Sequence, residues 1–316
     1  MTALECYKKC LVGKNDITVY ECSDGLFVGA DNYLNPTIVC KSKTPNNDVI
    51  RQRTERISLE YNVKMNCTIN GLDSEEVLHV FKCYAETTQE RDVFLQLTPL
   101  FEAANMAEDQ EDAFLELFDI LSAFFKDRTE PSNRELQGLF AELLTIWSYR
   151  DRFPFSNYWH TNENMKYDFS ISERVKVEVK STTRAERIHR FSHEQLINRS
   201  VEIVVISYRL QEDDQGLSLF DLIQKTKPLF IQKGDCLLLL TKFEKNVSED
   251  RLKSIKYNEE LAVQNRKIIP AKTLPQFPQA QPSGVFNAVY DCDVELGQEI
   301  GEDAFFDLLE ATRQAS

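Results

Sequence analysis

The chain has 316 residues, 42% of them apolar, which is enough for a sizeable core and suggests two domains or one large domain with additions. Its 37 basic and 51 acidic residues give a net charge of −14. This balance argues against a general affinity for nucleic acid or anionic membranes, so any site for a polyanion must be local.

Eight cysteines are spread through the chain without a CxxC pair or a histidine cluster that would complete a zinc site, so we expect reduced thiols. Residues 1–10 lack the apolar core of a signal peptide, and the longest apolar run, Cys236–Leu240, is too short to span a bilayer. We therefore expect a cytoplasmic protein with no membrane partner.

The first part of the chain reads as strands separated by Gly, Asn, Asp and Pro turns. The clearest runs are Ile17–Tyr20, Gly25–Val28, Thr37–Cys40 and Val77–Phe81. We expect a small β-rich domain over residues 1–105, and its motifs are too generic to indicate a ligand.

Helical periodicity follows. Apolar residues from Phe114 to Phe125 form one stripe, and a second stripe runs from Leu136 to Trp147 after the helix start at Ser132. Glu142 lies off this second stripe. From its spacing alone, a surface glutamate and a functional one are equally acceptable.

The most informative segment is a predicted β-hairpin. Residues 167–171 and 175–180 both alternate apolar with polar residues, and the three residues between them suit a turn. Pairing Phe169 with Val177 places Asp168 opposite Glu178, where like charges roughly 4.5–5.5 Å apart repel unless a cation lies between them. With Lys180 one step further along the same face, the hairpin predicts a site for a divalent metal with an ammonium beside it.

The remaining elements complete a second domain over residues 106–316, with a helical lead-in and a C-terminal strand and helix. After the hairpin we expect, in order, a helix near 190–196, a strand at 201–208, a helix at 217–226, a strand at 236–241, a strand at 285–294 and a helix at 302–313. This order predicts an α/β (α+β) fold with a mixed sheet flanked by helices.

The segment after the hairpin carries a local positive charge. From Glu173 to Arg199 there are seven Lys or Arg residues against four Glu, a balance of +3. The simple interpretation is a solvated face, but its position beside the predicted metal site favours a DNA-binding surface at Arg184, Arg187 and Arg190.

Asp168 followed by Glu178-Val179-Lys180 resembles the active-site pattern of the PD-(D/E)XK nuclease superfamily. The order of Gly138–Leu144, Trp159, Tyr167–Phe169, Val177–Lys180 and Phe191–Leu196 is similar to a PD-(D/E)XK family found among bacterial restriction and phage-defence genes. The specific part covers about a quarter of the chain. The chain has Tyr167 where the superfamily motif has Pro, and Ala141 where Gly is expected.

The resemblance implies a restriction-endonuclease-like core that binds Mg²⁺, or Mn²⁺ in its place. It implies that Asp168, Glu178 and the Val179 carbonyl surround the metal, with Glu142 binding or aligning one from its helix. Lys180 would orient the attacking water or stabilise charge on the phosphate, and Gln195 would contact the site or the DNA backbone.

Two functions follow as alternatives. The first is a Mg²⁺-dependent DNA endonuclease, the effector of a restriction or phage-defence system, controlled by protein partners from the same operon such as an ATPase or a methyltransferase. The second is a catalytically silent DNA-binding or assembly subunit in which Asp168, Glu178 and Lys180 form only a salt-bridged strand face. A homo-oligomer is compatible with both.

Overall fold

The computed structural model describes residues 1–10, 17–43, 49–126, 130–159, 166–197, 201–230, 234–277 and 288–313. The chain forms two compact units. The first comprises Met1–Glu130 and Ile231–Asn246, and the second comprises Pro131–Phe230 and Val247–Ser316. The division therefore falls after residue 130, not after residue 105, and a later segment returns to the first unit.

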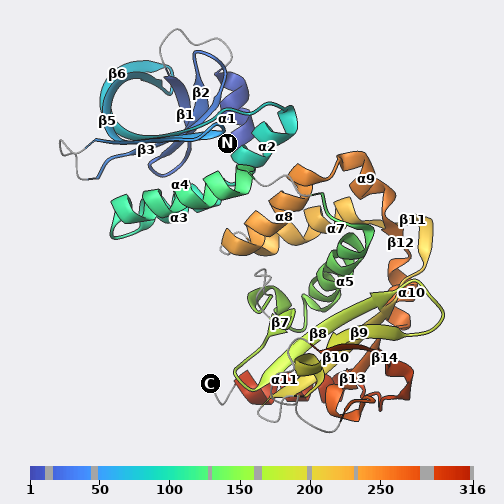
Figure 1. Cartoon of the computed structure of the whole chain (residues 1–316). Coiled ribbons are helices and arrows are strands. Elements are labelled where there is room, and N and C mark those ends of the chain that lie inside the picture. The colour runs from blue at the N-terminus through green and yellow to red at the C-terminus, as the bar shows by residue number, and fades with distance from the viewer. Residues whose placement is uncertain are drawn as a thin grey trace. The chain divides into compact units, whose positions relative to one another are not determined.

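A closed five-stranded barrel forms the centre of the first unit (Figure 1). Its strands follow the order β1-β2-β3-β6-β5, and a parallel pairing between β1 and β5 closes the ring. The strands are β1 (Ile17–Ser23), β2 (Leu26–Asp31), β3 (Pro36–Lys41), β5 (Ile57–Ile69) and β6 (Leu72–Cys83), with β4 (Ile50–Arg53) added on β5. Asn70 and Gly71 both have positive φ, which suits the tight turn of the long β5–β6 hairpin.

Helices cover this barrel and share its core. They are α1 (Ala3–Lys9), α2 (Thr88–Gln96), α3 (Thr98–Met106), α4 (Gln110–Lys126) and α8 (Gly234–Asn246). The predicted apolar stripe of α4 is buried as expected, and Phe114 packs against Phe81 of β6 with ring centroids 5.7 Å apart. The strands expected in the first part of the chain form this barrel, and the helices contribute to the same core.

The predicted strand at Cys236–Thr241 is wrong, because these residues lie in helix α8. The residues that α8 buries, Cys236, Leu237, Leu240, Thr241 and Glu244, repeat with helical spacing. A short run of leucines fits a buried strand or a buried helix equally well, and here Leu237 joins the core of the first unit.

A mixed four-stranded sheet forms the centre of the second unit, in the order β13-β10-β8-β7. Strands β8 (Val175–Thr182) and β10 (Glu202–Arg209) are parallel, whereas β7 (Phe169–Ser170) and β13 (Lys267–Pro270) pair antiparallel at the two edges. The edge strand next to β10 is β13. Helix α5 (Asn133–Tyr149) packs along β8 (Figure 1).

The other elements of the second unit flank this sheet. They are β9 (Ile188–Ser192), α6 (His193–Leu196), β11 (Glu212–Ser218), α7 (Leu219–Thr226), α9 (Glu249–Ser254), β12 (Lys256–Tyr257), α10 (Glu259–Gln264), β14 (Val289–Asp293) and α11 (Glu302–Arg313). The predicted C-terminal strand and helix are present as β14 and α11, although residues 285–287 lie outside the described part and β14 pairs with β9. Within the described residues, no helix is long and apolar enough to cross a membrane.

Candidate active site

The predicted hairpin forms with the expected register. Phe169 pairs with Val177, and the Ile171 amide donates a hydrogen bond of 3.1 Å to the Val175 carbonyl. Because β7 has only two residues, Asp168 lies just before it, where its side chain can turn toward β8. Asp168 Oδ2 accepts a hydrogen bond of 2.6 Å from the backbone amide of Val179.

Glu178 is the most buried acidic residue of the hairpin, with 2% of its surface exposed. Its Oε1 accepts a hydrogen bond of 2.8 Å from Gln195 Nε2 and forms an ion pair with Lys180 Nζ. Its Oε2 is buried and has no hydrogen-bond partner among the described residues. A buried carboxylate oxygen without a partner is costly, so this atom is suited to a cation ligand.

Glu142 reaches the same group of charges from a different element. It lies on α5, whose first turn is fixed by a capping box between Ser132 and Glu135. Its Oε2 accepts a hydrogen bond of 2.7 Å from the indole nitrogen of Trp159. Electrostatic interactions connect Glu142 with Glu178 and Lys180, so the helix and the hairpin contribute to one site.

Burial raises the pKa of all three carboxyl groups, and the charges of neighbouring carboxylates add to this effect for Glu142 and Asp168. Burial raises the pKa of Glu142 to about 7, with the charge of Glu178 adding to the effect and the Trp159 hydrogen bond opposing it. The pKa of Asp168 is well above its usual range because of burial and then the charges of Glu178 and Glu142. Burial also raises the pKa of Glu178, and Lys180 opposes this. Three such carboxyls favour a cation among them.

Lys180 and Gln195 complete the group. Burial lowers the pKa of Lys180, but the charges of Glu178 and Asp168 outweigh it, so the net pKa lies above the usual value. Its Nζ also lies 5.3 Å from the centre of the Phe191 ring. Gln195 Oε1 accepts from the Ser192 amide in the capping box of α6, which leaves Nε2 to donate to Glu178.

The residues present fit a hard divalent cation in their chemistry, because they supply carboxylate oxygens and the unpartnered Glu178 Oε2. In the described part of the chain, no group of three or more His, Cys, Asp or Glu side chains is already gathered as a metal site. The ion pair of Lys180 with Glu178 instead neutralises part of the charge. Binding of a metal would therefore require the carboxylates to draw together.

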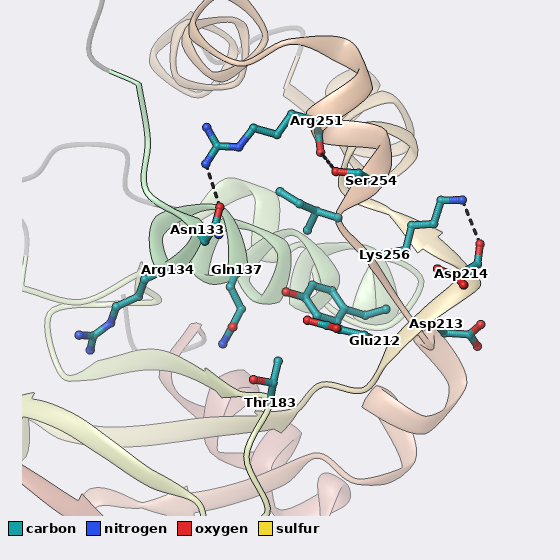
Figure 2. Close-up of a pocket in the computed structure, with 12 residues that line it drawn as sticks. Asn133, Arg134, Gln137, Thr183, Glu212, Asp213, Asp214, Arg251, Ser254 and Lys256 are labelled. Atoms are coloured by element: carbon teal, nitrogen blue, oxygen red, sulfur yellow. Dashed lines mark hydrogen bonds between the residues drawn. The ribbon is translucent and has the colours of Figure 1, made fainter.

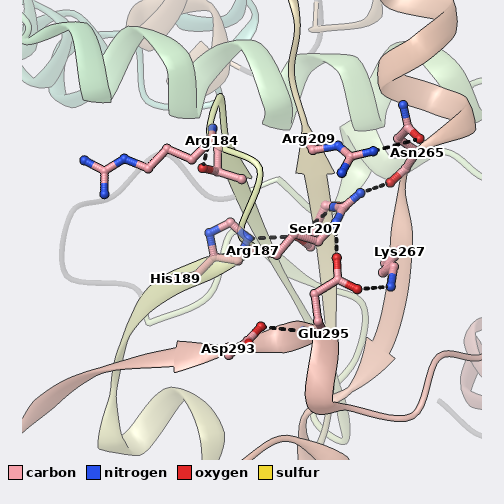
Figure 3. A network of polar contacts seen from close by, with 10 residues as sticks. Arg184, Arg187, His189, Ser207, Arg209, Asn265, Lys267, Asp293 and Glu295 are labelled. Carbon is pink, nitrogen blue, oxygen red and sulfur yellow. Dashed lines mark hydrogen bonds and ion pairs between the residues drawn. The ribbon is translucent and has the colours of Figure 1, made fainter.

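Of the three arginines expected on a DNA-binding surface, Arg187 is not available, since only 2% of it is exposed. Figure 3 shows its guanidinium among Ser207, Asn265 and Glu295. It donates 2.7 Å to the Ser207 carbonyl, donates to the Asn265 carbonyl, and lies 3.0 Å from Glu295 Oε1. Arg187 is a structural residue, in contrast to the expectation from the sequence, which could not show that the residue just before β9 is buried.

Arg184 and Arg190 are exposed. Arg184 points away from the network of Arg187 (Figure 3) and has no ion pair among the described residues. Arg190 Nε lies 2.9 Å from Asp291 Oδ1 on the neighbouring strand β14. An exposed pair of this kind contributes little to stability, so Arg190 remains able to contact a phosphate.

A separate cavity of about 480 Å³ lies beside the first turn of α5 and contains none of the predicted site residues. Its lining carries both signs of charge, with Arg134, Arg251 and Lys256 as well as Glu212, Asp213 and Asp214. In Figure 2, Arg251 is directed to Asn133, Lys256 is directed to Asp214, and Arg134 extends away from the other labelled residues. This mixture of charges does not favour a phosphate.

Comparison with known proteins identifies the family. No curated protein and no solved structure matches the chain. One family model does match, over residues 22–295, which covers both units. The region matched includes the hairpin with Asp168, Glu178 and Lys180, together with Glu142 and Gln195. The chain therefore belongs to the family described as "Putative PD-(D/E)XK family member, (DUF4420)".

Proposed function

We propose that this protein is a Mg²⁺-dependent DNA endonuclease. The observation that carries the proposal is the group formed by Asp168, Glu178 and Lys180 on one hairpin, in which Glu178 Oε2 is buried without a partner. Membership of a nuclease-like family supports phosphodiester hydrolysis as the reaction. The restriction-endonuclease-like arrangement of the core is part of this proposal.

The oxygens of Asp168 and Glu178 and the Val179 carbonyl would hold the metal, with Glu142 aligned from α5. A divalent cation bound there supplies a Lewis acid for the phosphate and lowers the pKa of water. Lys180 holds a positive charge beside Glu178, where it can orient the attacking water or stabilise charge on the phosphate. Gln195 keeps Glu178 in place through its 2.8 Å hydrogen bond.

We further propose that the protein acts in a bacterial restriction or phage-defence system with protein partners from its operon, such as an ATPase or a methyltransferase. A net charge of −14 opposes unassisted binding to DNA. Of the three arginines expected to bind DNA, only Arg184 and Arg190 are exposed. A partner that engages DNA would overcome this limit. It would also restrict cleavage to foreign DNA.

A second function is favoured by a different observation. Lys180 already pairs with Glu178, and Val179 already donates to Asp168, so the polar face is partly neutralised without metal. A catalytically silent DNA-binding or assembly subunit would keep this arrangement.

The test is cleavage of plasmid DNA with Mg²⁺, with Mn²⁺ and with chelator, by wild type and by Asp168→Asn, Glu178→Gln and Lys180→Ala. We expect metal-dependent cleavage that falls about a hundredfold or more in each variant. Lys176→Ala, on the same strand as Lys180, is the matched control and should cleave normally. Cleavage by all four variants at the rate of wild type would contradict the assigned site, and a wild type that neither cleaves DNA nor binds metal would favour the silent subunit.

A further inference from the structure

Trp159 is a buried residue with no role in the function proposed so far. Only 4% of its surface is exposed, and its ring packs against Phe230 with centroids 5.2 Å apart. Its indole N–H donates to Glu142 Oε2 at 2.7 Å. A buried indole N–H requires an acceptor, and here the acceptor is a carboxylate on the helix that faces the hairpin.

The backbone around Trp159 joins the edge of the hairpin. Trp159 forms a bridge with Phe169, and the Ser170 amide donates 3.0 Å to the Tyr158 carbonyl. Phe169 follows Asp168 directly. Trp159 is thus tied by its backbone to the strand that presents Asp168, and by its side chain to Glu142, 17 residues earlier in the chain.

Only one oxygen of Glu142 is used by this hydrogen bond. Within the described residues, no hydrogen bond to Oε1 is formed, while Glu142 interacts electrostatically with Glu178 and Lys180. A hydrogen-bond donor that fixes one oxygen of a metal-binding carboxylate and leaves the other for the metal is the usual form of outer-shell support.

We propose that Trp159 is a positioning residue for the metal site: its indole N–H fixes Glu142 of α5 against the edge of the hairpin, so that helix and hairpin supply carboxylates to one cation. This inference rests on the proposed function, because it assumes a divalent cation at Asp168 and Glu178. It assigns a purpose to the indole N–H, which the packing of the ring against Phe230 does not require.

The first experiment is calorimetric titration of the full chain with Mg²⁺ and with Mn²⁺, in wild type, Trp159→Phe and Trp147→Phe. Phenylalanine keeps a ring against Phe230 but removes the N–H. We expect Trp159→Phe to bind the metal about 10–100-fold more weakly, as for other outer-shell losses. Trp147→Phe removes the only other indole of the chain and should bind as wild type. Melting in chelator checks that each variant is folded.

The second experiment needs no change at Trp159. In Trp147→Phe, Trp159 is the one remaining tryptophan, so its emission reports on the contact with Glu142. We expect Mg²⁺ to shift this emission, and we expect Glu142→Gln added to the same protein to abolish the shift.

The outcomes separate the two proposals. If wild type and Trp159→Phe bind the metal equally well, only the proposed role of Trp159 is overturned. The role of Trp159 is also overturned if its emission does not change with Mg²⁺ in a protein that calorimetry shows to bind Mg²⁺. A wild type that binds neither Mg²⁺ nor Mn²⁺ overturns the proposed function, and this inference with it.

Discussion

Asp168 is joined to the backbone of Val179, the residue between Glu178 and Lys180, by a hydrogen bond of 2.6 Å to its Oδ2. The contact crosses the hairpin from just before β7 to the middle of β8. Since the donor is a backbone amide, it does not depend on the side chain at position 179. This bond therefore holds the Asp168 side chain beside the Glu-x-Lys segment before any metal binds.

The first prediction concerns Asp168→Asn. Asparagine keeps an acceptor for the Val179 amide but removes a charge from a site where burial and Glu178 already raise the pKa of Asp168. In chelator at neutral pH, the variant should be as stable as wild type or slightly more stable. Excess Mg²⁺ should stabilise wild type by about 2.7 kcal/mol at about a hundred times its dissociation constant, and the variant should lose most of this. Thermal melts measure both effects.

Glu173→Gln is the control for this experiment, because it neutralises an exposed carboxylate in the turn of the same hairpin. Its response to Mg²⁺ should equal that of wild type. If the hairpin is only a salt-bridged face, Asp168→Asn should instead be modestly destabilised, and Mg²⁺ should change neither melting temperature.

The second prediction concerns DNA binding by the exposed arginines. Charge reversal of Arg184 and Arg190 together should weaken binding and reduce the steepness of its salt dependence, since each phosphate contact contributes a slope of about 0.9. Arg187 is left out because its side chain is buried. Binding measured over a series of salt concentrations gives the slope. Lys64→Glu, in the first unit, is the control, and a slope that the double variant leaves unchanged would count against this surface.

The third prediction concerns Arg187→Met. This change removes the ion pair with Glu295 and leaves the carbonyls of Ser207 and Asn265 without their donor. Because Glu295 is 38% exposed and keeps its ion pair with Lys267, the loss comes mainly from the unsatisfied carbonyls, and the free energy of unfolding should fall by about 1–3 kcal/mol. Urea denaturation measures the loss. Arg190→Met, which breaks an exposed pair with Asp291, should cost about 1 kcal/mol or less. Similar losses in the two variants would show that the buried network is not stabilising.

The fourth prediction concerns pH and His79 in the barrel. His79 Nδ1 accepts a hydrogen bond of 3.1 Å from the Asn62 amide, and its ring stacks on Tyr61 at 4.1 Å. Burial lowers the pKa of His79 from 6.5 to about 4. Between these pH values the unfolded chain binds the extra proton, so stability should fall as pH decreases from 6.5 toward 4, by about 1.4 kcal/mol per pH unit.

His79→Gln is the variant for this test, because its side chain keeps an acceptor but does not titrate. It should be less stable than wild type near pH 7, and the difference should narrow as the pH decreases. Urea denaturation at several pH values follows this difference. If the free energies of unfolding of the two proteins change with pH in parallel, the conclusion that His79 is buried and neutral is contradicted.

Several parts of the structure could be predicted because the signals for them are local. The hairpin of residues 167–180 has alternation on both sides of a short turn, which determines which residues pair and places Asp168 next to the Glu178 segment. Helix α5 begins at its capping box, and α4 buries its predicted stripe. The strands of the barrel follow from turn residues at short intervals.

The sequence by itself determined the hairpin register and its charged face, since these depend on neighbours in the chain. The tertiary structure decided the rest. It placed Leu237 of an ambiguous apolar run in a helix of the first unit, buried Arg187 of a segment that reads as a basic surface, and joined Trp159 to Glu142. Each outcome depends on residues distant in sequence, which supply the apolar surface, the carboxylate or the hydrogen-bond acceptor. The local pattern of apolar and polar residues does not indicate these distant contacts.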